Sequence, residues 1–271
     1  MGEIAACNVT NDIFALNVPE ISGMLVFLAI NKNTPMRIAD GILKGIKYFI
    51  EEKLNSKIVG GHTIFSEWPL IGGEASGFVN KHLIIDKQGV KDGDKLLLTK
   101  PVGLQPIMAA YRILKDFPEM LEGYSEKNLK QSIKLAIKIM TTSNRSVVKT
   151  IHSYNDFSFI HAMTDITGFG LAGHTLELLQ NSNLSAFIET IPSIKFSESL
   201  SHELGYAFDE CKCAETAGGM LLAVDPLMIE DLSKNLKKKG ISNWMVGKID
   251  KISPGLVRIS ENLENLEVTK Y

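Results

Sequence analysis

The sequence is poor in cysteine and in aromatic residues, and it has no long apolar run. Three cysteines among 271 residues, Cys7, Cys211 and Cys213, are too few for the disulfide framework of a small exported domain. The longest apolar run, Met24 to Ile30, is far shorter than the roughly 20 residues that a membrane helix requires. The N-terminal residues lack the basic region and apolar core of an export signal. We therefore expect a cytoplasmic protein without a membrane span.

An excess of charge of either sign is also missing. Lys and Arg number 29 against 31 Asp and Glu, which gives a net charge of −2. This balance, with an aromatic content of 7%, does not fit a protein that neutralises a nucleic-acid backbone or stacks bases. With 45% hydrophobic residues, the chain can bury one or two cores. The composition favours a globular protein that acts on small molecules.

Apolar runs of strand length alternate with segments whose apolar residues recur at helical spacing. This alternation predicts an α/β or α+β fold in which helices pack on sheets. A Lys-Asp-Gly-Asp cluster at 91–94 is the best boundary, so we expect an N-terminal domain at 1–90 and a C-terminal domain at 91–271. The strands are predicted at 23–31, 56–59, 75–86, 95–99, 159–163, 185–189, 220–224 and 244–249. The helices are predicted at 4–16, 35–50, 107–114, 129–151, 171–179, 197–204 and 226–239.

The first predicted helix carries a polar pair, Asn8 and Asp12, which share a face because they are four residues apart. The apolar neighbours Ile13 and Phe14 place the Asp12 carboxylate at the edge of an apolar face, where it needs a partner. The alternative is a solvent-exposed aspartate near the end of the helix. Asp12 is a first candidate for a site residue.

A short glycine segment, Gly60-Gly61-His62-Thr63, follows one of the predicted strands. As a turn, it would offer backbone N–H groups to an anion without obstruction by a Cβ atom, next to an imidazole and a hydroxyl. The pattern of a P-loop is absent. The segment is a candidate phosphate contact, with an ordinary turn as the alternative.

Asp165 ends a predicted strand, and Thr167-Gly168-Phe169-Gly170 leads from it into a helix. Proteins of the α/β class bind metal ions and phosphates at such places, because the ligand gains both a carboxylate charge and the free N–H groups of a helix start. The alternative is that Asp165 or Thr167 caps this helix. The two interpretations are compatible.

Four further features have weaker signals. Lys100 follows a buried strand and could hold an anion at the end of the sheet, although an exposed loop lysine is the simpler interpretation. His174 is expected to be capped or solvent-facing rather than catalytic. The glycine turn at 216–219 is ambiguous. Cys211 and Cys213 lack the second ligand pair of a zinc site, so we expect half-buried thiols.

Five blocks of sequence follow one another along the chain: IAACNVTNDIFA at 4–15, GGHT at 60–63, LLLTKPVG at 96–103, MTDITGFGLAGH at 163–174 and ETAGGMLLAV at 215–224. Their order resembles the selenophosphate synthetase (selenide, water dikinase) family. This family belongs to a wider group that includes aminoimidazole ribonucleotide synthetase, thiamine monophosphate kinase and a hydrogenase maturation factor. The block at 163–174 favours selenophosphate synthetase over these relatives.

The resemblance implies a two-domain α/β architecture like that of aminoimidazole ribonucleotide synthetase, and a homodimer with a barrel between the N-terminal domains. Asp12 would contact ATP and magnesium, and Asp165 would be another magnesium ligand. Gly61, His62 and Thr63 would contact the nucleotide, partly across the dimer interface. Members of the family convert ATP, selenide and water into selenophosphate, AMP and orthophosphate. Carboxylates on separate elements are the ligands expected for magnesium on a triphosphate.

The sequence departs from the family at its N-terminus, because its first residues align within the first conserved helix of a typical member. The Cys (or selenocysteine) and Lys of the family's glycine-rich segment, and two further aspartates, have no counterpart. Cys7 does not match that nucleophile, so no catalytic residue is assigned. We therefore expect an incomplete N-terminal domain, which weakens three inferences: that this chain alone binds ATP tightly, that it forms the full barrel, and that it turns over. The family's Asp-Pro-Gln-Thr-Ser-Gly-Gly is also replaced by CAETAGG at 213–219.

Three functions are open on the sequence alone. The first is selenophosphate synthesis by a truncated or naturally shortened member of this family. The second is a non-catalytic scaffold or regulatory member that dimerises or binds a partner. The third is a related kinase or synthetase that uses ATP to phosphorylate another small molecule.

Overall fold

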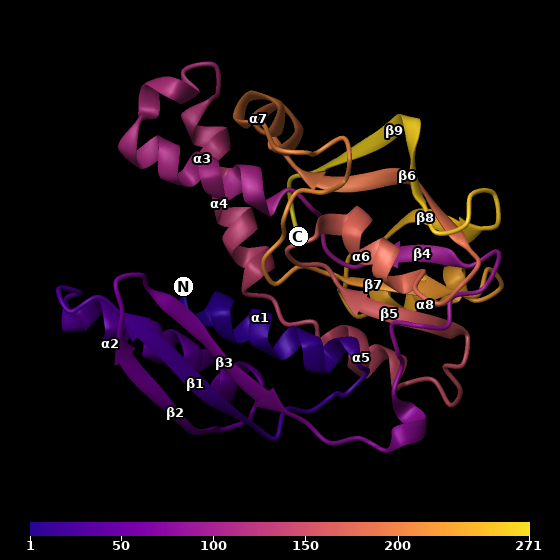
Figure 1. Cartoon of the computed structure of the whole chain (residues 1–271), viewed down its shortest axis with the longest axis horizontal. Coiled ribbons are helices and arrows are strands. Elements are labelled where there is room, and N and C mark those ends of the chain that lie inside the picture. Colours follow the sequence, from indigo (N-terminus) through magenta and orange to yellow (C-terminus); the bar gives the residue numbers. More distant parts are fainter.

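The computed structural model describes residues 1–271 as two β-sheets with helices packed against them (Figure 1). This is the mixed α/β class that the alternation of strands and helices predicts. None of the helices has the length and apolar character that a bilayer span requires. The first part comprises α1 (Gly2–Ala15), β1 (Gly23–Ile30), α2 (Met36–Lys47) with a π-helical continuation (Tyr48–Lys53), β2 (Ile58–Phe65), β3 (Leu70–Ser76) and a 3-10 turn (Lys81–Leu83). The second part comprises β4 (Lys95–Leu98), α3 (Leu104–Asp116), a 3-10 turn (Pro118–Leu121), α4 (Glu126–Met140), α5 (Arg145–Ile151), β5 (Ile160–Asp165), α6 (Gly170–Leu178), β6 (Ser185–Ile194), α7 (Ser197–Leu204), β7 (Met220–Val224), α8 (Ile229–Lys238), β8 (Trp244–Asp250) and β9 (Val257–Val268).

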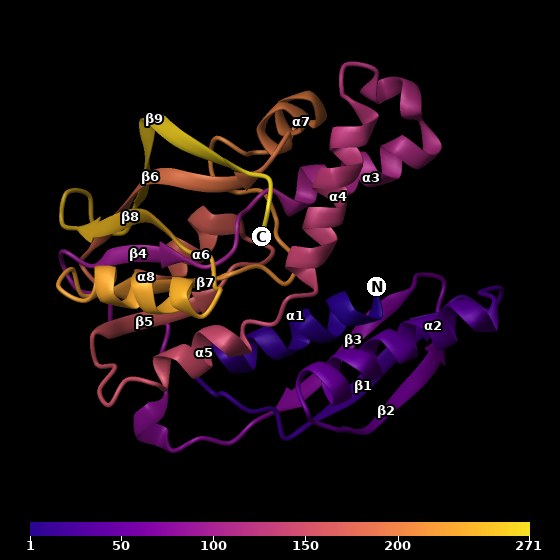
Figure 2. The ribbon, with the colours of Figure 1, turned by 180° about the vertical axis from the view of Figure 1, so that it is seen from behind.

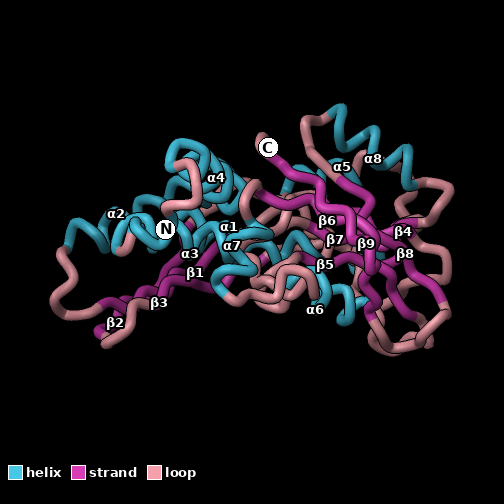
Figure 3. The backbone as a smooth tube through the Cα atoms, turned by 90° about the horizontal axis from the view of Figure 1, so that it is seen from above, coloured by secondary structure: helices cyan, strands magenta, loops and turns pink.

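The first sheet has three strands in the order β2-β1-β3, with β1 parallel to β2 and antiparallel to β3. Side chains alternate along β1, so Met24 and Val26 are buried in the core with α1 and α2, while Leu25 and Phe27 face outward. Gly61 permits the close pairing of β2, because a Cβ atom there would lie 2.2 Å from the carbonyl oxygen of Val26. Figure 3 shows α1 and α2 on one side of this sheet.

The second sheet has six strands in the order β5-β7-β4-β8-β6-β9. Neighbouring strands are antiparallel except β6 and β9, which are parallel. Every residue of β7 is buried, which explains the continuous apolar run at 220–224. Helix α6 packs on one face of this sheet, and α5 and α8 pack on the other (Figure 2).

A single apolar cluster of 29 buried residues joins the two sheets. It combines Phe14 of α1 and Ile46 of α2 with Leu222 of β7 and Leu232 of α8. A second cluster lies between the large sheet and α6, and a third lies among α3, α4 and α7. The shared cluster holds α1, which carries Asp12, against β5, which ends at Asp165.

The structure corrects several sequence-based predictions. Segment 60–63 is not a turn but the middle of β2, where its glycines allow extended pairing with β1. The strand predicted at 75–86 is wrong except for its first two residues, because the strand lies at Leu70–Ser76 and ends where its partner β1 begins, at Gly23. The helix predicted at 129–151 is interrupted at 141–144, where threonine hydroxyls donate back to the carbonyls of the last turn of α4. Strand β9 was not predicted, because polar residues interrupt its apolar pattern.

Candidate functional site

Asp165 ends β5, an edge strand of the six-stranded sheet. It is only 4% exposed, and the adjacent Ile166 N–H donates to the carbonyl of Gly219 at 2.9 Å. Burial raises the pKa of Asp165 to about 6, and the negative charge of Asp12 adds to this shift. A buried carboxylate without an ion-pair partner is costly, and a cation bound there would lower that cost.

Asp12 approaches the same place from α1 and is itself exposed. Its charge acts on Asp165, and α1 packs against β5. Lys87 and Lys100 contribute positive charge that partly offsets the two acids. The fold therefore places α1, which carries Asp12, against β5, which ends at Asp165, although the two residues lie far apart in the sequence.

Helix α1 is fixed beside this site by its asparagines, which bind the glycine turn at 216–219. Asn8 Oδ1 accepts the N–H of Ala217 at 2.7 Å. Asn11 and Asn144 both donate to the carbonyl of Gly218, at 3.4 and 2.8 Å, and Asn144 also donates to Asn11 at 3.0 Å. Asn8 thus shares the face of α1 with the predicted carboxylate but serves to position the helix.

Lys100 is 1% exposed and is not the loop lysine that the sequence suggests. Its Nζ atom donates to the carbonyls of Thr142 at 2.6 Å and Ala217 at 2.8 Å. Burial lowers the pKa of Lys100, while the nearby Cys7 and Asp165 act in the opposite direction. Lys100 therefore ties the loop after α4 to the glycine turn instead of reaching out to an anion.

Glu215 is a second buried acid, which the sequence alone did not single out as a site residue. It is 4% exposed, and its carboxylate accepts the N–H groups of Gly103 at 2.7 Å and Leu104 at 3.0 Å, where α3 begins. Burial raises the pKa of Glu215 to about 8, against the lowering effect of these two hydrogen bonds. The segment before β7 is thus anchored to the start of α3.

The start of α6 offers fewer free N–H groups than the sequence suggests. The N–H of Gly170 donates to the carbonyl of Thr167 at 3.0 Å, and that of Ala172 donates to the carbonyl of Cys211 at 2.9 Å. No side chain caps the helix, so Asp165 and Thr167 do not act as side-chain caps. Anion binding at this site would depend mainly on a metal ion held by the carboxylates.

His174 is 5% exposed and has a partner at each ring nitrogen, in contrast to the capped or solvent-facing side chain expected. Its Nδ1 atom lies 2.9 Å from Glu177 Oε2, and its Nε2 atom lies 3.1 Å from Thr167 Oγ1. Lys87 Nζ contacts the same Glu177 oxygen at 3.3 Å. The sequence could have indicated the contact between His174 and Glu177, because residues three apart on a helix lie on the same face.

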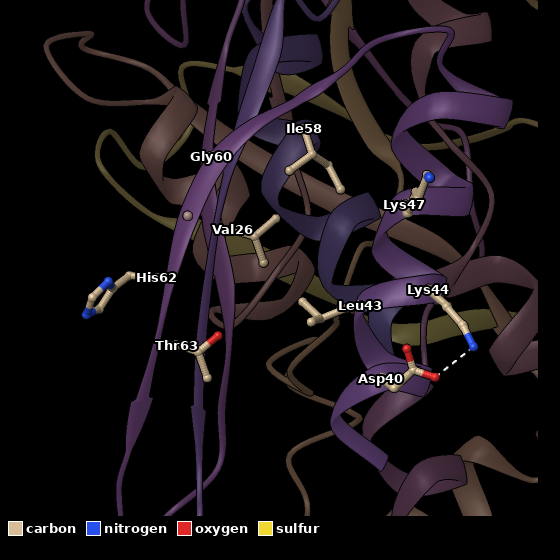
Figure 4. Close-up of a pocket in the computed structure, with 10 residues that line it drawn as sticks. Val26, Asp40, Leu43, Lys44, Lys47, Ile58, Gly60, His62 and Thr63 are labelled. Carbon is tan, nitrogen blue, oxygen red and sulfur yellow. Dashed lines mark ion pairs between the residues drawn. The ribbon is translucent and has the colours of Figure 1, made fainter. Parts of the chain in front are cut away.

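The glycine segment of β2 presents its side chains to both faces of the first sheet. Thr63 lines a groove of about 430 Å³ between β2 and α2, together with Lys44 and Lys47. The His62 side chain points away from α2 (Figure 4), and it pairs across the sheet with the outward-facing Phe27. The groove includes neither of the two carboxylates. Within one chain, the predicted nucleotide-contacting segment is therefore separate from the predicted metal ligands.

All three cysteines are buried and unpaired. Cys7 Sγ donates to the carbonyl of Thr142 at 3.3 Å. Burial raises the pKa of Cys7 and Cys211, which disfavours the thiolate that metal binding or nucleophilic attack requires. The cysteines are core residues, more buried than the half-buried thiols expected.

Two family models match the chain. AIR synthase related protein, N-terminal domain, matches residues 1–79, and AIR synthase related protein, C-terminal domain, matches residues 91–253. The selenide, water dikinase of Methanococcus maripaludis is 38% identical over 270 residues, which cover 98% of this chain and 80% of that relative. The protein of the same name from Methanocaldococcus jannaschii is 38% identical over 270 residues, which cover 98% of this chain and 77% of that relative.

Solved structures share the fold at lower sequence identity. Hydrogenase maturation protein HypE in complex with ATP has a TM-score of 0.75 at 15% identity. The match covers 95% of this chain and 75% of the HypE chain. Thiamine monophosphate kinase from Aquifex aeolicus has a TM-score of 0.66 at 15% identity, and the match covers 98% of this chain and 83% of the kinase chain. From the two family models and the identity to the archaeal enzymes, the chain belongs to the selenide, water dikinase family of AIR synthase related proteins.

Proposed function

We propose that this chain binds ATP and magnesium between α1 and β5 and uses them to phosphorylate selenide, releasing selenophosphate, AMP and orthophosphate. The observation that carries the proposal is the packing of α1, which carries Asp12, against β5, which ends at the buried Asp165. The names of the archaeal relatives support selenide and water as substrates. HypE, which has the same fold and was solved in complex with ATP, supports ATP as the nucleotide.

The residues at this place fit a magnesium ion. Burial and the like charge of Asp12 raise the pKa of Asp165, so a divalent cation between the two carboxylates would relieve their repulsion. Carboxylate oxygens are also the hard ligands that magnesium prefers, with water and phosphate oxygens as the remainder. When bound, magnesium would neutralise phosphate charge and polarise the phosphoryl group. The chain itself orients the carboxylates, through Asn8 and Asn11 on α1 and through the pairing of β5.

We further propose that the protein acts as a homodimer joined through the outer face of the first sheet. Leu25 and Phe27 on this face are 45% and 38% exposed, and Leu70 is 56% exposed. Exposed apolar patches of this kind are typical of interfaces, and both β2 and β3 are edge strands. A second copy is the occupant that we favour, because His62 lies on this face and would complete a nucleotide site from across the interface. The three reduced, buried thiols support a cytoplasmic location.

The proposal is tested by incubating the chain with ATP, Mg²⁺ and selenide and following the products by phosphorus NMR. We expect selenophosphate, AMP and orthophosphate, and where the chain alone releases no AMP, the same products once an N-terminal segment that carries the family's Cys and Lys is supplied. In calorimetry, Asp12→Asn and Asp165→Asn should each weaken magnesium-ATP binding by about 10-fold or more, since each removes an anionic ligand. Asp92→Asn, which alters an exposed aspartate paired with Lys251, should bind like the wild type.

Other outcomes would contradict the proposal. ADP as the final nucleotide, with a phosphorylated organic acceptor, would support a related small-molecule kinase. A wild-type chain that folds and dimerises but does not bind magnesium-ATP would support a scaffold role, which the naming of the relatives as dikinases does not favour.

A further inference from the structure

Thr167, His174 and Glu177 place a hydroxyl, an imidazole and a carboxylate in hydrogen-bond contact beside the carboxylate site. The Oγ1 to Nε2 distance is 3.1 Å and the Nδ1 to Oε2 distance is 2.9 Å. Thr167 follows Asp165 by two residues, so its hydroxyl stands at the same end of β5. In this arrangement the imidazole could act as a base toward the hydroxyl, and the carboxylate could orient the imidazole.

The tautomer of His174 follows from its partners. An ionised carboxylate can only accept, so Nδ1 carries the proton that is donated to Glu177. Burial lowers the pKa of His174, against the opposing effect of Glu177, and this favours the neutral ring with a free lone pair on Nε2. The hydroxyl of Thr167 therefore donates to Nε2. Its oxygen is left with acceptor lone pairs, which suit a water molecule and not a phosphate oxygen.

Surrounding residues hold the three groups in place. The backbone carbonyl of Thr167 accepts the N–H groups of Gly170 at 3.0 Å and Glu215 at 2.9 Å. The ring centroids of Phe169 and His174 lie 5.6 Å apart. Lys87, from the segment between the two sheets, pairs with Glu177 at 3.3 Å. A hydroxyl supported in this way has a fixed direction, which is the requirement for orienting a reactant.

We propose that the Thr167 hydroxyl holds the water molecule consumed in the reaction. His174, oriented by Glu177, takes up a proton from this water through the Thr167 hydroxyl. This inference rests on the proposed function. As the water oxygen bonds to phosphorus, the phosphorus–oxygen bond to the leaving group breaks and that oxygen keeps the electron pair. A water proton passes to Thr167 Oγ1, and the proton already on Thr167 passes to His174 Nε2. The resulting imidazolium is stabilised by the Glu177 carboxylate.

Two substitutions at Thr167 separate its chemistry from its packing. Thr167→Val removes the hydroxyl at nearly constant volume, and Thr167→Ser keeps it. We expect kcat for AMP formation to fall about 100-fold in Thr167→Val and in His174→Gln, whose amide cannot take up a proton. Thr167→Ser should stay within about 3-fold of the wild type, because it keeps the hydroxyl that relays the proton. The Kd for magnesium-ATP should stay at the wild-type value in all three variants, in contrast to Asp165→Asn.

A readout that needs no ligand is the nitrogen NMR spectrum of the His174 ring in the nucleotide-free protein. We expect a protonated Nδ1 and an unprotonated Nε2, with the Nε2 resonance shifted in Thr167→Val. An Nε2–H tautomer, or wild-type kcat in Thr167→Val, would overturn the inference. Weakened magnesium-ATP binding in Thr167→Val would reduce the residue to a structural role and would also overturn it. A wild type that does not bind ATP refutes the proposed function itself, so the two failures are distinguishable.

Discussion

At the scale of single residues, burial decides the behaviour of the charged groups around the site. Glu215 has two N–H partners, yet burial raises its pKa to about 8, from a reference value of 4.5. The folded protein therefore retains a proton that the unfolded chain releases as the pH rises above the reference value. By linkage, this residue lowers the stability of the fold progressively between the two pKa values.

Glu215→Gln should remove this pH dependence, because the amide does not ionise. The wild type should lose up to about 1.4 kcal/mol of unfolding free energy per pH unit through Glu215 as the pH rises between these values. The variant should lack that part of the slope, and it should be less stable than the wild type at pH 5, because its amide nitrogen cannot accept the N–H group that one carboxylate oxygen accepts. Urea unfolding of both proteins from pH 5 to pH 8, in metal-free buffer, measures the difference. Equal slopes would show that Glu215 does not retain its proton in the folded state.

At the scale of elements, β2 depends on a close approach that only glycine allows. A Cβ atom on Gly61 would lie 2.2 Å from the carbonyl oxygen of Val26 in the neighbouring strand. The segment that looks like an anion-binding turn is instead held in a parallel pair with β1. This placement sends His62 to one face of the sheet and Thr63 to the other.

Gly61→Ala should lower the free energy of unfolding by about 2 kcal/mol or more, since the strands must separate to admit the methyl group. Gly72→Ala on β3 is the matched control, because a Cβ atom there meets no atom within 4 Å, and both variants are compared in a Phe27→Lys background because Gly72 pairs with Phe27 on the proposed dimer face. Urea unfolding at one protein concentration compares the two variants. A loss in Gly72→Ala as large as that in Gly61→Ala would point to a general cost of replacing glycine in this sheet, not to the contact with Val26.

At the scale of the whole molecule, the two sheets share one apolar cluster, while the outer face of the first sheet has no cover within the chain. The shared cluster makes the position of α1 relative to β5 a property of the whole fold. The uncovered face leaves Phe27 and Leu25 in contact with solvent in a single copy. The shared cluster holds the helix of Asp12 against the strand of Asp165. The uncovered face carries His62, which would reach a nucleotide site only across an interface between two copies.

Phe27→Lys should convert the dimer to a monomer, because a charge on each copy would be buried at the centre of the joined sheets. Light scattering after size-exclusion chromatography measures the mass. Leu227→Lys changes a residue that is 89% exposed on another part of the surface, and it should leave the dimer intact. A monomeric wild type, or a Phe27→Lys protein that is still dimeric, would refute this interface.

The amino-acid sequence predicts the α/β class and most of the helices and strands, because neighbouring residues set which face of a helix or strand is apolar. It also marks Asp12 on a helix face and Asp165 at a strand end, while their role as magnesium ligands is what the resemblance to the selenophosphate synthetase family implies. Tertiary packing places Asp165 where the charge of Asp12 acts on it, buries Lys100 and holds the glycine segment as a strand. These three features depend on contacts between segments far apart in the chain, whereas the contacts of His174 with Thr167 and Glu177 lie within segment 167–177 and depend on the start of α6. Burial then sets the charge state of the groups at the site.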